Sequence, residues 1–597
     1  MKQISPYLFT GKKNTETISP ILIYSSYNPF NQMRKTTSTL LLLVAMALCG
    51  RASAIDPADV KPVKNLILLI PDGTSIATVS TARWYQWYKD PNRQHLAIDP
   101  YLCGTVRTFS SNAPIGDSAP TTSCYVTGHP SRTGYIATYP PADPGNDIFP
   151  VDPSRAYQPM ITLLEAMRLV QNKATGLVVT CEFTHATPAD CSAHSYSRKR
   201  YDWIAPQIVH NDVDVVMGGG VSLLDKEGEA YLRSRGYSVY RDDLAGMRAD
   251  NNGKMWALFG KKEMDYDLDR DPAKQPALEE MTRKALEKLS KNENGFFLMV
   301  EGSKVDWAAH GNDPVGMLTE YVAFDKACAV ALDFAKKDGQ TLVVVVPDHG
   351  NSGFSLGRRD CKGYDKLTKD QLFSFVTGVK NTAQGFVNKL NAAPSTEVQK
   401  IFKENAGFEL TDEELQALYN CKDYKNSPIP EDKRAEKESL SALYSNSLYG
   451  FVAKLLTSKT CFGFTTGGHT GEDVILAAYH PQGTLPIGVN TNIDLHRYMA
   501  SAVGLLGKPD ELTQEYFVPH TELLKGYKYT ILPAKTEKDN PTLVVKGKKQ
   551  QLTITPFTNI IRKGKKANDE IRLSTVIVYV DKNNTFYLPR SITKYLE

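Results

Sequence analysis

The sequence predicts an α/β fold, a three-layer sandwich with a central, mostly parallel β-sheet, to which a helical insertion and a small β-rich C-terminal domain are added. Short apolar runs rich in β-branched residues recur along the chain, and each is followed by polar or glycine-rich residues. Runs of this length and composition are typical of strands buried on both faces. Segments with helical periodicity separate them, and this alternation indicates a parallel sheet covered by helices.

The elements of this sandwich can be located along the chain. Six apolar runs are interpreted as strands, at 65–71, 176–181, 213–217, 296–301, 341–347 and 474–479. Helical patterns occupy 160–171, 277–290 and 315–336. Sheets of this kind bind ligands beyond the carboxyl ends of their strands. The residues that follow each run are therefore the candidates for a functional site.

Two regions depart from the alternation. Polar helical segments replace strands from about 360 to 460, and one helix should start within Leu410-Thr411-Asp412-Glu413-Glu414-Leu415. We interpret this region as an insertion in an α/β domain that spans 55–528. Alternating Val, Ile and Thr residues near the end indicate a small β-rich domain at 529–597. Length alone would suggest about four domains, but one large domain with an insertion accounts for it as well.

The N-terminus contains an export signal that begins inside the chain. Met33-Arg34-Lys35 is a basic n-region, Leu40 to Leu48 is an apolar h-region, and Ala52-Ser53-Ala54 is a cleavage site. We therefore interpret 33–54 as a signal peptide and 1–32 as an extension upstream of the true start. The mature protein is expected to be exported, either to the periplasm or out of the cell.

The composition is that of a globular protein, with 41% hydrophobic and 23% charged residues. No apolar run is long enough to cross a bilayer. The net charge of +4 is too small to indicate a nucleic-acid partner, and none is expected. Basic clusters at 546–549 and 562–566 are interpreted as solvated loops.

Cysteine usage agrees with an oxidising compartment. The chain has nine cysteines, and one of them lies in the signal segment, which leaves an even number. Cys181 and Cys191 are close enough in sequence to pair, and a bond between Cys421 and Cys461 would close the insertion. Cys124 is expected to be a buried free thiol. Many other connectivities remain open.

Asp117-Ser118-Ala119-Pro120 places a serine at the start of a predicted helix. The free N–H groups and the dipole of a helix N-terminus favour an anion, so Ser118 is a candidate nucleophile. On its own the motif is better explained by a helix cap with Pro120 in the first turn. The choice depends on what the rest of the chain supplies.

Acids and histidines directly follow the predicted strands or lie in the helices and loops next to them. They are Asp72, Glu301, Asp306, His310, Asp348, His349 and His469. Asp306 and His310 are spaced i, i+4, which puts both on one helical face, where they can bind one metal ion. Each residue alone is typical of a turn, but together they should meet at one edge of the sheet. A mixed imidazole and carboxylate set favours zinc.

With these motifs the chain resembles the alkaline phosphatase family over roughly 62–357 and 463–506. The resemblance implies hydrolysis of phosphate monoesters through a phosphorylated Ser118, with phosphate bound by Arg198 and Asp117 orienting that arginine. It also implies two zinc ions and one magnesium ion. The implied ligand sets are Asp306, His310 and His469 for one zinc, Asp72, Asp348 and His349 for the other, and Asp72, Thr187 and Glu301 for magnesium, with His185 beside it.

Three positions depart from the family pattern. His185 stands where some relatives carry an acid, which reduces the negative charge of the magnesium site. Trp307 replaces a lysine or histidine that contacts phosphate through water, and Asn351 replaces a histidine behind the metal ligands. These positions tune the site, and all six zinc ligands remain.

Other functions remain as alternatives. A sulfatase shares the same sheet, and Ser118-Ala119-Pro120 resembles the start of a sulfatase maturation motif, but Thr122 stands where that motif requires arginine. A phosphodiesterase is disfavoured because a bidentate arginine leaves no room for a second ester group. A phosphate-binding protein without activity would not need all the zinc ligands and the serine. The expected substrates are small phosphomonoesters, and the family implies a homodimer as the candidate assembly.

Overall fold

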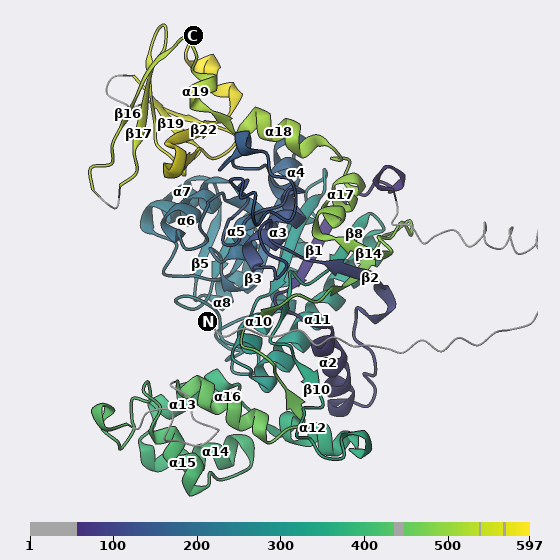
Figure 1. Ribbon diagram of the computed structural model, residues 1–597. Helices are drawn as coiled ribbons and strands as arrows, with labels where there is room; N and C mark the ends of the chain where they lie inside the picture. The colour runs from purple at the N-terminus through teal and green to yellow at the C-terminus, as the bar shows by residue number, and fades with distance from the viewer. Residues whose placement is uncertain (1–55, 435–446, 537–538, 565–568) are drawn as a thin grey trace, which may run out of the picture. The chain divides into compact units, whose positions relative to one another are not determined.

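The computed structural model describes residues 56–434, 447–536, 539–564 and 569–597. A ten-stranded sheet lies at its centre (Figure 1). The strands, in spatial order, are β14 (Gly488–Thr491), β2 (Leu102–Arg107), β13 (Val474–Tyr479), β8 (Thr341–Val345), β1 (Asn65–Pro71), β7 (Phe296–Gly302), β3 (Ala174–Glu182), β4 (Val215–Gly219), β6 (Met255–Leu258) and β5 (Ser238–Arg241). Only β13 runs antiparallel to its neighbours, β2 and β8. The predicted mostly parallel sheet is confirmed.

Each face of the sheet has its own hydrophobic core. Ile67 and Leu69 of β1 belong to one core, whereas Leu66, Leu68 and Ile70 belong to the other. This alternation follows from the two-residue period of a strand, and it requires both faces to be covered. Helices cover both faces, which makes three layers (Figure 1). The first face carries α2 (Ile76–Lys89), α9 (Leu278–Leu289) and α11 (Pro314–Asp338), and the second carries α3 (Ser118–Thr127), α4 (Leu163–Gln171) and α17 (Asn492–Ala502).

Every apolar run that was interpreted as a strand belongs to the sheet, with ends shifted by a few residues. The helix predicted from residue 160 begins later because Thr162 caps α4 in a capping box with Glu165. The sequence patterns did not predict β2, β5, β6 and β14, all of which lie at or next to an edge of the sheet. The remaining helices of the α/β region are α5 (Ala186–Ser192), α6 (Tyr201–His210), α7 (Lys226–Ser234), α8 (Leu244–Ala249), α10 (Lys304–His310), α18 (Lys508–Tyr516) and α19 (His520–Leu523).

The predicted helical insertion lies between two short strands, β10 (Ser355–Leu356) and β11 (Phe462–Gly463), which pair with each other in antiparallel fashion. The predicted helix start is confirmed, since Thr411 caps α15 in a capping box with Glu414. The helices of the insertion are α12 (Lys369–Gly378), α13 (Ala383–Ala392), α14 (Val398–Ala406), α15 (Asp412–Tyr419) and α16 (Leu448–Ser458).

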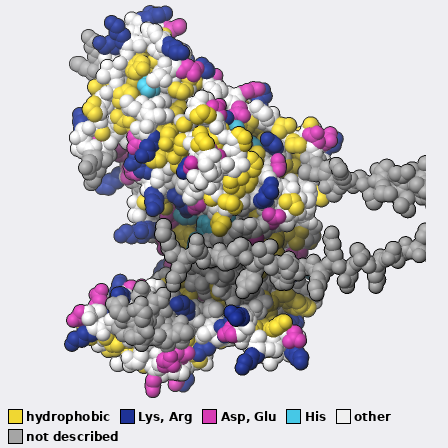
Figure 2. All heavy atoms as spheres, viewed as in Figure 1, with side chains coloured by type: hydrophobic (Ala, Val, Ile, Leu, Met, Phe, Trp, Pro, Cys, Tyr) yellow, Lys and Arg dark blue, Asp and Glu magenta, His cyan; other side chains and the backbone are white. Residues whose placement is uncertain are grey.

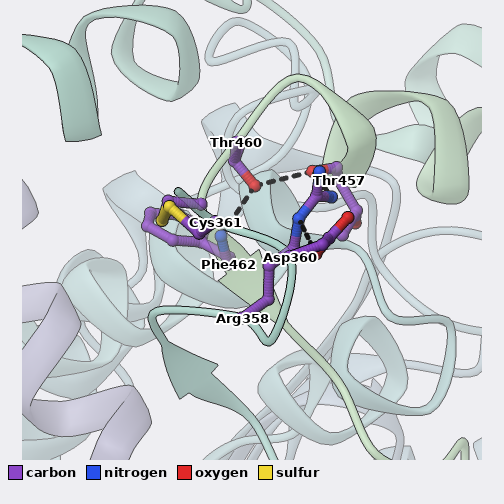
Figure 3. The surroundings of a disulfide bond; sticks show 7 residues. Arg358, Asp360, Cys361, Thr457, Thr460 and Phe462 are labelled. Atoms are coloured by element: carbon purple, nitrogen blue, oxygen red, sulfur yellow. Dashed lines mark hydrogen bonds and ion pairs between the residues drawn. A yellow bond between two sulfur atoms is a disulfide. The ribbon is translucent and has the colours of Figure 1, made fainter. Parts of the chain in front are cut away.

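A disulfide joins the two ends of the insertion, but it is not the predicted one. Cys461 pairs with Cys361, at a Cα–Cα distance of 5.5 Å, so the predicted Cys421–Cys461 bond is wrong (Figure 3). The N–H groups of Gly357 and Arg358 both donate to the carbonyl of Cys461, which brings residue 361 alongside. The Cys421 thiol, just beyond the C-terminus of α15, instead donates to the carbonyl of Ala417 in that helix. The pairing of β10 with β11, which are far apart in sequence, therefore determines which cysteine bonds to Cys461.

The C-terminal region is rich in β-structure, as predicted. Five strands form an antiparallel meander, and three more form a second small sheet. They are β16 (Lys528–Leu532), β17 (Thr542–Lys546), β18 (Gln551–Ile554), β19 (Ile560–Lys563) and β20 (Asp569–Arg572) in the first, and β15 (Val518–Pro519), β21 (Val578–Val580) and β22 (Thr585–Leu588) in the second. This region therefore uses residues that precede the expected boundary at 529.

Two further expectations concern the surface and the N-terminus. Acidic and basic side chains are interspersed over the face seen in Figure 2. Among the described residues, no helix has the length and apolar character needed to cross a bilayer. The expected signal peptide at 33–54 and the extension at 1–32 lie outside the described residues.

Candidate active site

The predicted site residues meet where three neighbouring parallel strands end. β8, β1 and β7 are adjacent, and Ile70 of β1 pairs in register with Glu301 of β7. Asp72 directly follows β1, and Asp348 and His349 follow β8 by a few residues. The carboxyl ends of parallel strands lie on one edge of a sheet, so these side chains lie next to one another at that edge.

Ser118 lies at the N-terminus of α3, against this edge. It is the first residue of the helix, only 2% exposed, and its Oγ lies 3.2 Å from Nε2 of His349. Asp117 occupies the N-cap position, but its side chain does not cap the helix. The hydroxyl is therefore presented beside free backbone N–H groups, in a setting that favours an anion.

The carboxylate of Asp117 faces the guanidinium of Arg198. Its Oδ1 lies 2.5 Å from Nη1 of Arg198, and its Oδ2 accepts a bond of 2.9 Å from the N–H of Gly134. On the other side, Nε2 of His185 accepts from Nη2 of Arg198 at 3.1 Å. Burial and the charge of Arg198 lower the pKa of His185 to about 3, so the ring is neutral. A guanidinium has five N–H donors, and those not used here can bind an anion.

Three histidines lie close together, and in each of them Nδ1 faces a backbone carbonyl. The Nδ1 atoms of His310, His349 and His469 lie 2.8, 3.1 and 2.7 Å from the carbonyl oxygens of Gly467, Gly350 and Gly116, respectively. A carbonyl only accepts, so each Nδ1 carries the proton and each Nε2 offers a lone pair. The Nε2 atoms of His310 and His469 lie 3.1 Å apart. Two lone pairs at this distance repel each other unless a cation or a proton lies between them.

Carboxylates surround these nitrogen atoms. Asp306 places Oδ2 3.4 Å from Nε2 of His310 and Oδ1 3.8 Å from Nε2 of His469. Asp348 and Asp72 place oxygens 3.3 and 3.6 Å from Nε2 of His349. A network of unprotonated nitrogens and carboxylate oxygens around one space is typical of a metal site with carboxylate and histidine ligands.

Several buried carboxylate oxygens at this site have no hydrogen-bond donor and could be satisfied by a cation. Both carboxylate oxygens of Asp72 are buried without a hydrogen-bond donor, as is Oδ2 of Asp348. Burial and the charge of Asp348 raise the pKa of Asp72 well above its usual range. Buried acceptors without donors are costly, and native proteins nearly always satisfy them. A divalent cation would satisfy them here, so the residues fit a metal centre.

The candidate ligand atoms form three groups, in each of which they lie within 4.8 Å of one another. The groups are Asp306, His349 and His469, then Asp72, Asp348 and His349, and finally Cys181, His185 and Glu301. His349 belongs to two groups, although the sequence motif assigned it to one ion. Its side chain therefore lies where the first two groups of candidate ligands meet.

The third group contains a residue that sequence analysis missed. Cys181 was predicted to pair with Cys191, and this prediction is wrong, because both thiols are free and buried. The Cys181 thiol donates to Oε2 of Glu301 at 3.4 Å, whereas the Cys191 thiol donates to the carbonyl of Thr187. Cys124 is buried and free, as predicted. Cys181 lies one residue before the carboxyl end of β3, as Glu301 does in β7, and this position could have identified it.

The remaining members of the predicted magnesium set lie beside Cys181. Oε1 of Glu301 and Oγ1 of Thr187 are both buried without a hydrogen-bond partner. Burial raises the pKa of Glu301 to about 8. The structure thus brings all twelve predicted site residues, Ser118 and Arg198 among them, to one edge of the sheet.

Neighbouring residues fix the position of Asp306. Asn351 donates from Nδ2 to Oδ1 of Asp306 at 2.7 Å, which orients this carboxylate. Gly73 has φ of +59°, and a Cβ at this position would lie 2.2 Å from the same oxygen, so only glycine fits. Trp307 packs its ring edge-on against that of His185, with centroids 5.8 Å apart.

Comparison with known proteins decides the family. The family model for alkaline phosphatase matches residues 63–505, which is most of the chain. The chain belongs to the alkaline phosphatase family. Alkaline phosphatase 3 of Bacillus subtilis is 32% identical to it over 459 residues, which cover 74% of this chain and 89% of the relative. Repressible alkaline phosphatase of Saccharomyces cerevisiae is 30% identical, with 74% and 80% covered.

Solved structures of the family have the same fold. The cold-active alkaline phosphatase of a Shewanella species is 27% identical, with a TM-score of 0.61, and the match covers 74% of this chain and 99% of that one. The enzyme of Thermus thermophilus is 23% identical, with a TM-score of 0.59 and coverage of 74% and 92%. This alkaline phosphatase is therefore a phosphoric monoester hydrolase with a metal site at the carboxyl edge of its sheet.

Proposed function

We propose that this alkaline phosphatase transfers the phosphoryl group of a phosphate monoester to Ser118 and then to water. The observation that carries the proposal is the position of Ser118 Oγ, which is buried at the start of α3 and lies 3.2 Å from Nε2 of His349. Arg198, oriented by Asp117, supplies a guanidinium on the same edge of the sheet.

We assign two zinc ions and one magnesium ion to this edge. Asp306, His310 and His469 would hold the first zinc ion, and Asp72, Asp348 and His349 the second. Asp72, Thr187 and Glu301, with His185 beside them, form the magnesium-type site. When bound, the ions supply Lewis-acid charge that lowers the pKa of hydroxyl groups and water and neutralises charge on oxygen.

The chain's own residues perform the transfer in two displacements. Ser118 Oγ attacks phosphorus and loses its hydroxyl proton, the bond from phosphorus to the ester oxygen breaks, and the ester oxygen takes up a proton and leaves as the alcohol, so that phosphoserine remains. Water then attacks the phosphoserine, which releases inorganic phosphate and restores the hydroxyl. Throughout, the free N–H groups of α3 and the unused donors of Arg198 face the phosphoryl oxygens. Asp117 orients Arg198 and does not act as the base, because both its oxygens are already hydrogen-bonded.

The same residues select the substrate. A bidentate guanidinium matches two non-bridging oxygens of a dianionic monoester, and a diester has a second ester group in that space. Small phosphomonoesters are therefore the proposed substrates, and the chemistry favours no particular alcohol. The alternative function is that of a sulfatase or a phosphodiesterase of the same superfamily.

A comparison of three chromogenic substrates tests this function. Aryl phosphate should be hydrolysed faster than aryl sulfate and bis-aryl phosphate, and a chelator should abolish the activity. Ser118→Ala should abolish turnover and the acid-stable phosphoserine, while Thr122→Val, a buried control in the same helix whose Oγ1 has no hydrogen-bond partner, should keep both. Faster sulfate turnover, or phosphate turnover unaffected by metal removal, would overturn the assignment.

Export and assembly complete the proposal. We propose that the mature protein begins after residue 54 and functions in the periplasm or outside the cell, as a homodimer. Sequencing the N-terminus of the secreted protein and measuring its mass in solution test both points. An intact segment 1–54 on the exported protein would contradict the first, and a monomeric mass the second.

A further inference from the structure

We propose that the third ion site of this chain contains a thiolate. Cys181, Glu301 and His185 would bind a thiophilic divalent cation, zinc or cobalt, in preference to magnesium. The proposal rests on the proposed function and deepens it, since it replaces the magnesium ion that the family pattern implies at this site by a thiophilic ion and names the ligands.

The sheet places the thiol beside the carboxylate. Cys181 is the last but one residue of β3 and Glu301 the last but one of β7, and these strands are parallel neighbours. Leu177, Val179 and Cys181 alternate along β3 and face the same core, which is the core that α5 covers. His185 is the N-cap residue of α5, so the turn after β3 returns the imidazole to the side of the sheet where the thiol lies.

The distance between the two ligand atoms fits zinc. Sγ of Cys181 lies 3.4 Å from Oε2 of Glu301. A tetrahedral zinc ion has bonds of about 2.3 Å to sulfur and about 2.1 Å to oxygen, which places the two ligands about 3.6 Å apart. Octahedral magnesium has bonds of about 2.1 Å, which place neighbouring ligands about 3.0 Å apart, and it binds oxygen rather than sulfur. The pair is therefore spaced for zinc.

Several buried polar atoms around this pair have no partner. They are Oε1 of Glu301, Nδ1 of His185 and Oγ1 of Thr187. A cation bound by Sγ and the carboxylate would satisfy acceptors that are otherwise orphaned. Binding replaces the thiol proton, which is released to solvent, so the site gains the negative charge that an acid supplies in some relatives.

His185 links this site to the phosphate clamp. Its Nε2 accepts a hydrogen bond from Arg198, so Nδ1 carries the ring proton. A neutral imidazole has one lone pair, which cannot serve both Arg198 and a metal ion. Ion binding by His185 therefore releases Arg198 from this bond and leaves Asp117 as its remaining support. Phosphate affinity and third-site occupancy are consequently coupled, and the coupling is reciprocal.

Cobalt loading of the full-length mature enzyme tests the proposal. Wild-type protein, stripped of metal and reloaded with Co²⁺, should show near-ultraviolet thiolate-to-cobalt charge-transfer absorption. Cys181→Ser should lose this absorption and keep the visible bands of the other cobalt sites. Cys328→Ala is the matched control, because Cys328 is an equally buried free thiol in α11, on the opposite face of the sheet, and it should keep the absorption.

A second measurement does not depend on the spectrum. After dialysis with excess magnesium, wild-type protein should retain about one zinc ion per chain more than Cys181→Ser does. Absence of thiolate absorption in the wild-type protein, its persistence in Cys181→Ser, or equal zinc retention by the two proteins would overturn the proposal. The wild-type spectrum gives a result even if the variant fails to fold. Ser118→Ala should keep the absorption without turnover, which separates this test from that of the proposed function.

Discussion

The hydrogen bond between Asp117 and Arg198 offers the sharpest test of how this site binds phosphate. Asp117→Asn preserves the shape of the side chain and removes its charge. Oδ1 of Asp117 lies 2.5 Å from Nη1 of Arg198, and Oδ2 accepts from the N–H of Gly134. The amide can keep one of these bonds as an acceptor, but its NH2 group faces a donor at the other. Arg198 should therefore lose part of its orientation.

The magnitude follows from the exposure of the pair. A hydrogen bond to a charged group contributes about 1.5–3 kcal/mol, against about 0.5–1.5 kcal/mol for a neutral one. The side chains of Arg198 and Asp117 are 23% and 18% exposed, so solvent screens the charge only in part. We expect a loss of about 1 kcal/mol in transition-state binding, which is about a fivefold fall in kcat/KM. Arg198 contacts the phosphoryl group in substrate and transition state alike, so KM should rise and kcat should change little.

Steady-state kinetics with an aryl phosphate and inhibition by inorganic phosphate measure this effect. The inhibition constant of phosphate should rise together with KM. Asp202→Asn is the control, since Asp202 is exposed in α6 and its loss changes net charge by the same amount. A fall confined to kcat would refute the reasoning, because it would mean that Asp117 acts in the chemical step. Unchanged kcat/KM would refute it as well.

Three further predictions concern metal affinity, the insertion and pH. Asn351→Ala removes the donor to Asp306 and should weaken zinc binding about 10–100-fold in equilibrium dialysis. Replacing Cys361 and Cys461 by alanine opens a loop of 100 residues and should lower the free energy of unfolding by about 2–4 kcal/mol, measured with urea. Burial lowers the pKa of Lys173 to about 8 from 10.5, so the folded state loses this proton first as pH rises. The stability of the wild-type protein relative to Lys173→Met should therefore rise between pH 8 and pH 10.5.

Each of these predictions has a control and a contradicting result. Asn251→Ala changes an exposed asparagine and should leave zinc affinity unchanged. Equal zinc affinities of the wild-type protein, Asn351→Ala and Asn251→Ala would contradict the role of Asn351. Cys421→Ala removes a buried free thiol, and a loss of stability as large as that of the double variant would exclude the disulfide as the cause. A constant stability difference across the alkaline range would contradict the shifted pKa of Lys173.

Local patterns predicted most of the α/β fold. Each buried strand can be predicted from its own residues, because a strand buried on both faces needs a continuous run of apolar, often β-branched residues whichever strands it pairs with. The edge strands were missed because they are short, and in β2 every residue except Val106 is exposed or only partly buried. Such strands are defined by the neighbour with which they pair. The capping boxes at Thr162 and Thr411 each involve residues only three positions apart, so the start of α15 after Thr411 could be predicted from the sequence.

The sequence by itself determined which chemical groups are available at the carboxyl edge of the sheet. The order of acids and histidines after the strands, and the serine that opens α3, depend only on positions along the chain. The tertiary structure decided how these groups act together. Carbonyls of Gly116, Gly350 and Gly467 orient the three histidines. Strand pairing places Cys181 beside Glu301. It also brings Cys461 within bonding distance of Cys361. These choices depend on distances between segments far apart in sequence, which no local pattern contains.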